Sequence, residues 1–330
     1  MKKYKYICVN NPITLKFMFK YIIKFYNDND KNKIIGIDFE FYKVSKENKN
    51  VSLIQINLEN STDNAFIFIF NPNNLSNKKI NVFIKLICSR RIIKIIHGGE
   101  SLDIPYLFDN LFNKNSKLIR KFLKNLYDTK FICQYLGFDK CNIYDLLHKL
   151  NVINEKKLNE LNELNEKIGP IYNITLDMDN VIKNNNYKEY VINDVLYLPS
   201  LFNKIKNNND IYLLQELTSI NYYIKRNYYK KFNILYDKIN KMNNYFIIDK
   251  TKIKLIDFYN NNNILLKFNK VTYFNQFIQT IIKCLLYKEI YNKYTIYKSN
   301  GVKYNEKIDC QEIIKKYKNL SKFIKKIKIL

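Results

Sequence analysis

Two acidic residues, Asp38 and Glu40, lie two positions apart in the otherwise apolar segment IIGIDFEFY (34–42). Alternate residues of an extended strand point to the same face, so both carboxylates would project side by side. Two like charges on a central strand are costly unless a cation neutralises them, whereas the solvated face of an edge strand carries them easily. The D-x-E pair alone therefore indicates either a cation site or an ordinary edge strand.

Two later motifs offer the same chemistry. Asp103 follows the apolar segment RIIKIIH (91–97), near the start of an expected helix whose dipole would also favour an acid there. Tyr190 and Asp194 are four positions apart in YVINDVLYL and share one face of an expected helix, where a tyrosine bonded to a carboxylate is also an ordinary structural pair. Their order, with D-x-E first, a single Asp next and Y-x-x-x-D last, favours one shared site.

With these motifs in this order, the sequence resembles the ribonuclease D group of the DEDDy 3'-5' exonuclease superfamily. IGIDFEFY resembles the first motif of that group, KIIHGGESLDIPYLF the second and YVINDVLYLPSLF the third. The segments VSLIQINL, FNP and LYDTKFICQYLG also fall where the group has its second strand, the end of its third strand and the helix after the second motif. The resemblance covers about residues 5–206. One departure is that Asp103 lies six residues after His97, one more than in close relatives, which implies a small bulge.

The resemblance implies that Asp38, Glu40, Asp103 and Asp194 bind two divalent cations and that Tyr190 helps to orient the attacking water. Hard oxygen ligands suit Mg²⁺ or Mn²⁺. Two such ions about 3.5–4 Å apart can activate water on one side of a phosphodiester and stabilise the leaving 3'-oxygen on the other. The implied reaction is hydrolysis of RNA or DNA at single-stranded 3' ends, which releases nucleoside 5'-monophosphates.

Two rival functions belong to other classes. One is a catalytically inactive exonuclease-fold module that binds nucleic acid without holding metal. The other is a basic helical adaptor with an incidental D-x-E strand. The complete set of acids and the tyrosine argues against the first, and the ordered motifs argue against the second.

Other residues near the motifs have structural interpretations. Neither histidine is needed as a base in this chemistry. His97 is either a residue beside the metal pocket or a hydrogen-bonded core residue, and His148 is expected to be structural or exposed. Phe39 and Phe41 alternate with the acids, so we expect them on the opposite face of the sheet, in the core.

The elements that must position these residues alternate between strands and helices up to residue 206, which predicts an α/β domain. The resemblance implies a ribonuclease H-like fold, a mixed five-stranded sheet flanked by helices with its second strand antiparallel. The first helix is expected at 13–26, after a short possible strand at Tyr6–Val9, and Ser101 is a candidate N-cap for the helix of the second motif. The leucine-rich stretch 154–167 is expected to be a surface insertion. Four strands can be placed from the apolar pattern, at 34–42, 51–58, 65–70 and 91–97, and a further strand–helix pair is expected at LYDTKFICQYLG (126–137).

Residues 1–206 are predicted to form the exonuclease domain, and 207–330 a basic, mainly helical region that binds nucleic acid or packs on the domain. The best linker candidate is NNND at 207–210. Residues 205–330 hold 25 basic and 9 acidic residues, so most of the net charge of +26 lies there. Such an excess favours a polyanionic partner, and nucleic acid is the commonest one. Bases could stack on C-terminal tyrosines, but with 28 tyrosines in the chain the sequence nominates none.

Composition excludes several classes of protein. Of the 330 residues, 47% are apolar, enough for a sizeable core, yet no run approaches the 18 apolar residues of a membrane span and no secretory leader is recognised. The six cysteines contain no CxxC pair, and two histidines are too few for a structural zinc site. We therefore expect an intracellular protein with buried thiols in a reducing compartment, whose protein partners the sequence does not identify.

Overall fold

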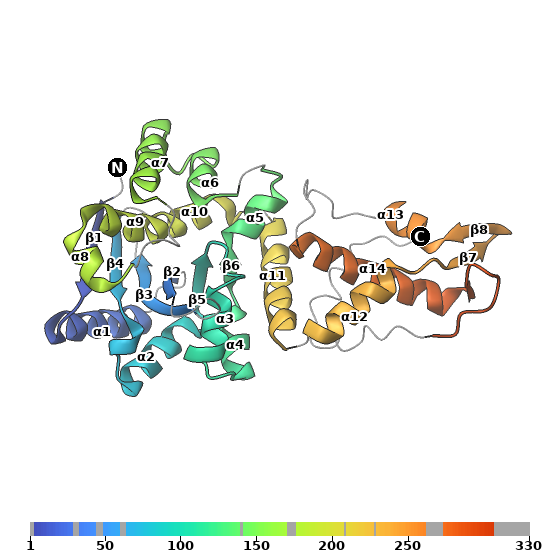
Figure 1. Ribbon diagram of the computed structural model, residues 1–330, viewed down its shortest axis with the longest axis horizontal. Helices are drawn as coiled ribbons and strands as arrows, with labels where there is room; N and C mark the ends of the chain where they lie inside the picture. Colours follow the sequence, from blue (N-terminus) through green and yellow to red (C-terminus); the bar gives the residue numbers. More distant parts are fainter. Residues whose placement is uncertain are drawn as a thin grey trace. The chain divides into compact units, whose positions relative to one another are not determined.

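The computed structural model of the chain consists of two compact units (Figure 1). The first unit comprises residues 1–133 and 140–219, and the second comprises 134–139 and 220–330. Helix α11 (Asn209–Asn227) begins inside the NNND stretch, and the division between the units falls within this helix. The described residues are 3–28, 33–43, 49–59, 64–138, 141–169, 176–207, 209–227, 229–261 and 273–306.

The first unit is built on a six-stranded mixed sheet with the order β1-β4-β3-β2-β5-β6. β3 is antiparallel to both of its neighbours, β2 and β4, and the other pairs are parallel. The α/β exonuclease fold with an antiparallel second strand is therefore confirmed, and β1 adds a sixth strand beside β4. The strands are β1 (Lys3–Val9), β2 (Lys33–Lys43), β3 (Lys49–Glu59), β4 (Asn64–Phe70), β5 (Ile92–Ile96) and β6 (Leu126–Asp128).

Strand β2 runs through the middle of this sheet, between β3 and β5. Its apolar residues Ile35 and Ile37 are fully buried. The parallel pairing with β5 ends at Gly36, and the pairing with β3 shifts register between Glu40 and Phe41. Asp38 therefore lies beyond the last pair with β5 on an interior strand, and the edge-strand interpretation of the D-x-E pair is wrong.

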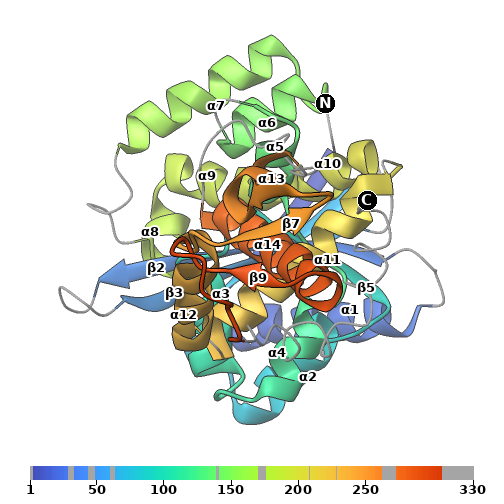
Figure 2. The ribbon, with the colours of Figure 1, turned by 90° about the vertical axis from the view of Figure 1, so that its right-hand side faces the viewer.

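Helices cover both faces of the sheet. α9 (Asn185–Leu196) packs on β2, β3 and β4, and α10 (Leu198–Ile205) packs on β2 and β5. α1 (Pro12–Asn27) and α2 (Asn77–Ile87) pack on each other, across the sheet from α9 and α10 (Figures 1 and 2). The remaining helices of this unit are η1 (Pro72–Asn74), α3 (Asp103–Tyr106), the π-helix η2 (Leu107–Leu111), α4 (Ser116–Leu123), α5 (Thr129–Tyr135), α6 (Ile143–Lys149), α7 (Glu155–Ile168) and α8 (Met178–Lys183).

The leucine-rich stretch forms α7, which packs on α6 and α9. Its side chains Leu158, Leu161 and Leu164 are all buried. Three apolar residues at three-residue spacing lie along one side of a helix, so this stripe is enough to attach α7 to the unit. The stretch therefore lies at the surface, as expected, with its leucine side packed on the unit beside the third motif.

Two of the six cysteines form a disulfide. Cys133, at the end of α5, is bonded to Cys141, which precedes α6, with 5.6 Å between their Cα atoms. Cys8, Cys88 and Cys284 are not in a disulfide, and Cys310 lies outside the described residues. The expectation that all the cysteines are buried thiols is therefore wrong for the Cys133–Cys141 pair. Among the helices described, none combines the length and apolar content needed to cross a bilayer.

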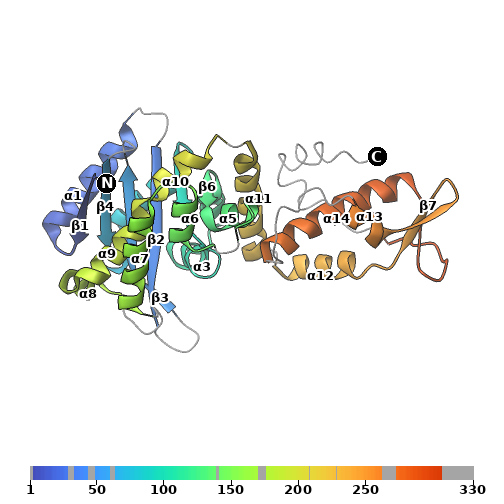
Figure 3. The same cartoon turned by 90° about the horizontal axis from the view of Figure 1, so that it is seen from above.

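The second unit is mainly helical, as expected, and also contains a small antiparallel sheet with the order β8-β7-β9. Helices α12 and α14 run alongside each other (Figures 1 and 3), and β7 and β9 lie side by side in Figure 2. The lysine-dense tail at 315–330 lies outside the described residues. The elements are α12 (Tyr229–Asn240), β7 (Tyr245–Ile248), β8 (Thr251–Lys254), α13 (Leu255–Asn261), α14 (Tyr273–Lys293) and β9 (Ile296–Tyr297).

Candidate active site

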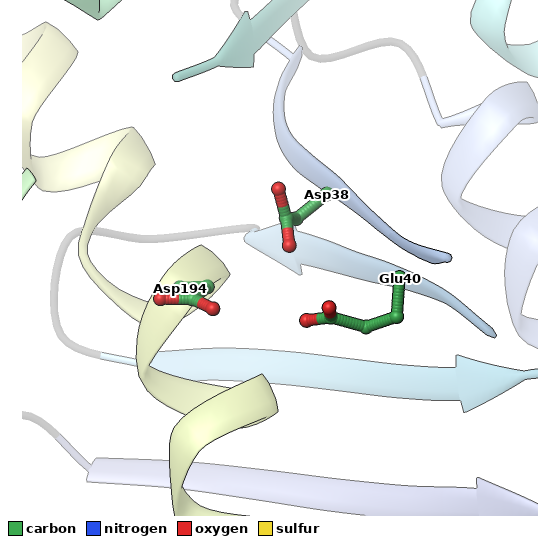
Figure 4. Close-up of side chains that lie close together, drawn as sticks. All are labelled: Asp38, Glu40 and Asp194. Atoms are coloured by element: carbon green, nitrogen blue, oxygen red, sulfur yellow. The ribbon is translucent and has the colours of Figure 1, made fainter. Parts of the chain in front are cut away.

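Three carboxylates meet where α9 crosses β2. Asp38 and Glu40 point from β2 toward Asp194 on α9 (Figure 4), and each of the three offers an oxygen within 4.8 Å of the others. Glu40 is buried, and the other two are half-buried. Gln55 on β3 donates a hydrogen bond to Glu40 Oε1 at 3.3 Å, which fixes that side chain. The structure thus brings together three of the four acids that the sequence singled out.

Two residues of the sheet let the end of α9 come close enough for this contact. The buried amide of Asn57 donates hydrogen bonds to the carbonyls of Val195 and Leu196, each at 3.1 Å. Gly36 has no side chain where a Cβ would lie 3.0 Å from the Val195 carbonyl oxygen. Because Asp194 directly precedes these anchored carbonyls, Asn57 and Gly36 set its distance from β2.

Two tyrosine hydroxyls approach Asp194. Tyr144 on α6 donates a hydrogen bond to Asp194 Oδ1 at 3.1 Å, and Tyr190 is also hydrogen-bonded to the Asp194 side chain. Burial and the nearby acids raise the pKa of both phenols far above the usual value, so both stay protonated and act as donors. Tyr144 is 1% exposed, whereas Tyr190 is partly exposed. Tyr144 cannot be predicted from the sequence, because the residue has no spacing relation to any motif.

The fourth acid, Asp103, begins α3 and is buried beside the cluster without belonging to the set within 4.8 Å. It is close enough that its charge raises the pKa of Glu40, and the charge of Asp38 raises the pKa of Asp103. Gly99 makes room here, since a Cβ at that position would lie 2.5 Å from Ile96 Cδ1 and 3.4 Å from Asp103 Oδ2.

A wide turn leads into α3. The Ile104 N–H donates to the carbonyl of Gly99 at 3.0 Å, spanning five residues rather than the four of a regular α-helical bond. This turn accommodates the additional residue of the second motif. Ser101 is not the N-cap, because the helix begins at Asp103 after Leu102 and has no side-chain cap. That sequence prediction is therefore wrong.

Asp128 is an acid of this region that sequence reasoning missed. It ends β6, is 1% exposed, and accepts hydrogen bonds from the backbone N–H groups of Gly98 and Gly99 at 2.8 and 3.0 Å. Its charge also raises the pKa of Asp103. Asp128 thus fixes the turn at Gly98 and Gly99 that precedes Asp103. The only sequence feature that marks Asp128 is its position at the end of an apolar strand.

The electrostatics of the four acids are dominated by burial and by mutual repulsion. Burial raises the pKa of Asp38 to about 7. Burial first, and then the charges of neighbouring acids, raise the pKa values of Glu40, Asp103 and Asp194 well above their usual range. Among the described residues, the groups that shift these four pKa values are other acids, tyrosines, Gln55 and the backbone, and none is a lysine or an arginine. The site is arranged for an added cation, because like charges at this distance are otherwise relieved only by binding protons.

His97 is a hydrogen-bonded core residue, which is one of the two roles that the sequence allows for it. Its Nε2 donates to the carbonyl oxygen of Cys141 at 3.0 Å, and its Nδ1 lies 2.8 Å from Thr129 Oγ1. Burial lowers the pKa of the imidazole, which keeps it neutral. His97 therefore connects the end of β5 to α5 and to the segment before α6. Phe39 is buried on the face of β2 opposite the acids, as expected, and contacts the ring of Tyr106.

Comparison with known proteins decides the family. Residues 11–210, which include all three motifs, match the model of the 3'-5' exonuclease family. The chain belongs to the 3'-5' exonuclease family. This exonuclease is 31% identical to the uncharacterised protein L533 of Acanthamoeba polyphaga mimivirus, over 98% of its own length and 72% of that relative. The resemblance stated from the motifs is confirmed at the level of this family, and the chain is a hydrolytic exonuclease.

Solved structures similar to the exonuclease include two ribonucleases D. The Trypanosoma brucei enzyme in complex with RNA U12 has a TM-score of 0.47 and 16% identity, over 67% of this chain and 70% of that one. Escherichia coli RNase D has a TM-score of 0.46 and 12% identity, over 71% of this chain and 55% of that one. The catalytic core of Trypanosoma brucei RRP6 has a TM-score of 0.44 and 13% identity, over 66% and 52%.

Proposed function

We propose that this exonuclease hydrolyses the 3'-terminal phosphodiester of single-stranded RNA or DNA by a two-metal mechanism and releases nucleoside 5'-monophosphates. The observation that carries the proposal is the convergence of Asp38, Glu40 and Asp194 within 4.8 Å on an interior strand and a helix packed against it. These acids raise one another's pKa values, and no basic side chain among the described residues offsets them there.

The residues present fit divalent cations. Three carboxylates from two elements supply hard oxygen ligands, which suit Mg²⁺ or Mn²⁺ rather than softer metals. Asp38, Glu40 and Asp194 would hold one ion, and Asp103 with Asp38 would hold the second. When bound, such ions supply Lewis-acid chemistry, lowering the pKa of the attacking water and stabilising the leaving 3'-oxygen.

The two tyrosines beside the acids have different positions and different proposed roles. Tyr144 donates to one oxygen of Asp194 and so turns that carboxylate toward Asp38 and Glu40. Tyr190 is less buried, and its hydroxyl lies at the same carboxylate, where it can orient the water for in-line attack. A rigidly placed donor of this kind contributes to the rate by holding the nucleophile in an attack geometry.

A net charge of +26 supports a polyanionic substrate. The ribonuclease D structure from Trypanosoma brucei was determined with RNA, which makes RNA the first substrate to test. The inactive binding module remains the alternative, and the intact set of four acids and Tyr190 counts against it.

The test is degradation of 5'-labelled RNA and DNA of matched sequence with Mg²⁺, with Mn²⁺ or with EDTA. We expect progressive shortening from the 3' end with either metal, none in EDTA, and 5'-monophosphates as the product. Asp38→Asn should abolish hydrolysis and leave much of the nucleic-acid binding. The matched control is Asp109→Asn, which changes an exposed acid directly after the second motif and outside the cluster and should retain activity. An active Asp38→Asn enzyme would remove the two-metal assignment.

A further inference from the structure

The small sheet of the second unit carries a row of residues that the register defines. On its outer face, Tyr245 of β7 lies opposite Lys254 of β8 on one side and Tyr297 of β9 on the other. Tyr297 is in turn bridged to Lys303. The order across the face is therefore Lys254, Tyr245, Tyr297, Lys303, with the two tyrosines side by side between two exposed lysines.

The two tyrosine rings stack on each other. Their centroids are 5.5 Å apart and the ring planes differ by 21°. Lys252 places its ammonium group over the Tyr245 ring, 3.9 Å from its centroid. Ile247, opposite Lys252, is 45% exposed. We call this set the lysine–tyrosine face; it consists of Tyr245, Ile247, Lys252, Lys254, Tyr297 and Lys303.

The other side of the same sheet belongs to the core. Phe246 is fully buried and contacts the rings of Phe258 and Tyr294, and Ile296 is 2% exposed. Alternate residues of each strand therefore divide between a buried face and an outer face. Because the inner residues supply the packing, the folding of the sheet does not explain why tyrosines and lysines occupy the outer side.

The charged residues of the lysine–tyrosine face are all lysines, so the face is positively charged. Its three lysines are exposed. Three acids lie three positions from a lysine of the face: Asp249 is in the turn between β7 and β8, Asp257 is in the first turn of α13, and Glu306 is bound by Lys238 and Tyr304. Basic side chains beside aromatic rings are the combination with which proteins bind unpaired nucleic acid, since every base has a flat face to stack and every nucleotide a phosphate to neutralise.

We propose that the lysine–tyrosine face binds an unpaired segment of nucleic acid. Bases stack against the Tyr245–Tyr297 pair, Lys252 turns from the Tyr245 ring toward the backbone, and the three lysines contact the backbone phosphates. The proposal rests on the proposed function only in taking nucleic acid as the ligand, and it requires no hydrolysis. An acidic protein would satisfy the lysines but would leave the rings without a role, and a duplex would hide the base faces that the rings need.

The test measures binding with the full chain carrying Asp38→Asn, in EDTA, so that nothing is cleaved. The probe is a fluorescein-labelled oligouridylate of about 12 nucleotides, read by anisotropy, with a blunt RNA duplex of the same length beside it. Tyr245→Ala with Tyr297→Ala should weaken binding of the single strand about tenfold or more and change duplex binding little, because stacking on each ring is lost. Tyr245→Phe with Tyr297→Phe should bind as tightly as the parent, since both rings remain.

The lysines are tested through salt. Changing Lys252, Lys254 and Lys303 to Gln should reduce the slope of log affinity against log salt by about 2, from roughly 0.7 for each phosphate contact. Lys293→Gln, at the exposed end of α14, is the matched control and should leave the slope unchanged. Thermal melting shows whether each variant is folded. If the alanine variant unfolds, the phenylalanine and glutamine variants still test the roles of the rings and of the lysines.

Three results would overturn the proposal. They are an alanine variant that is folded and binds the single strand like the parent, a phenylalanine variant as weak as the alanine variant, and polyglutamate competing as well as unlabelled oligouridylate. Absence of hydrolysis by the wild-type enzyme would count against the proposed function alone, because these binding measurements do not depend on it.

Discussion

The four acids at the site make the stability of the metal-free enzyme depend on pH. Burial raises the pKa of Asp38 from its ordinary value of 3.8 to about 7, so in the folded state this carboxyl keeps its proton to higher pH than in the unfolded chain. The stability that this proton provides is complete below about pH 4 and is lost as the pH rises through 7. We expect the melting temperature in EDTA to fall over this range, and Mg²⁺ at neutral pH to restore it. Differential scanning fluorimetry measures both effects.

The Asp38→Asn variant serves as the control for this pH dependence. It removes one of the repelling charges, so its melting temperature in EDTA at neutral pH should exceed that of the wild type, and Mg²⁺ should raise it less. If the wild type were equally stable in EDTA from pH 4 to pH 8, the carboxylates would not be electrostatically coupled in the way the structure indicates.

The two tyrosines on Asp194 should contribute differently to catalysis. Tyr190 is a half-buried residue whose hydroxyl lies at the Asp194 carboxylate, where we propose that it orients the attacking water. Tyr190→Phe should therefore reduce turnover about 10²-fold or more with little change in metal affinity. Tyr144→Phe removes a donor to the same carboxylate from a residue that is 1% exposed and cannot contact substrate, so turnover should fall less than about tenfold. Single-turnover rates with saturating metal separate the two. Equal losses would make Tyr190 a second support for Asp194 rather than a positioner of water.

Local spacing predicted some of these residues and missed others. Asp38 and Glu40 alternate along one strand and Tyr190 and Asp194 are four apart on one helix, so their shared faces follow from the sequence. Tyr144 contacts Asp194 across 50 positions, and no periodicity encodes such a contact. Asn57 and Asp128 were missed for the same reason, because each bonds backbone groups of a distant element.

At the scale of elements, the distance between α9 and β2 decides whether the site forms. Gly36→Ala would place a Cβ 3.0 Å from the Val195 carbonyl oxygen and 3.1 Å from Leu198 Cβ, so α9 and α10 must move away by a few tenths of an ångström. We expect overpacking to reduce stability by about 1–3 kcal/mol. Turnover should fall by at least about tenfold, because misplacement of Asp194 by even part of an ångström disturbs the attack geometry.

The control for Gly36→Ala is a core change of similar cost away from the site. Ile119→Val in α4 truncates a fully buried side chain and should reduce stability by about 0.5–1.5 kcal/mol while turnover stays near that of the wild type. Urea denaturation and initial rates on the same preparations compare the two. A Gly36→Ala enzyme as active as Ile119→Val would show that α9 tolerates displacement.

The elements themselves follow closely from apolar patterning, and the exceptions have physical causes. β2, β3 and β4 lie within two residues of the predicted strands, because long apolar runs between polar turns leave few alternatives. The repeated Asn, Glu and Leu of α7 resemble a low-complexity segment, so the packing of this helix on the unit is not predicted from the sequence, yet its three leucines are buried. The small sheet of the second unit escaped prediction because its strands are only two to four residues long.

At the scale of the whole molecule, most of the net positive charge lies in a different part of the chain from the motif acids. Residues after Asn227 include 22 basic and 7 acidic residues and none of the motif acids. A chain ending at residue 206 would lose α11. In this helix, the side chains of Gln215 and Ser219 donate hydrogen bonds to the carbonyl of Leu123, at 3.0 and 2.7 Å, and so attach α11 to the end of α4. It would also lose the buried side chain of Leu214. The appropriate cut is therefore after Asn227, where α11 ends.

We expect the 1–227 fragment to keep its chemistry and lose affinity. All the carboxylates of the site and both tyrosines remain, so turnover at saturating substrate should change little. The Michaelis constant should rise and its dependence on salt should weaken, by roughly 0.7 in the log–log slope for each phosphate contact removed. Initial rates on single-stranded substrate across about 50–200 mM salt measure both quantities, with circular dichroism to establish folding. A folded fragment with the affinity and salt slope of the full chain would place the whole substrate path within the first 227 residues, and the C-terminal lysines would then have no part in binding.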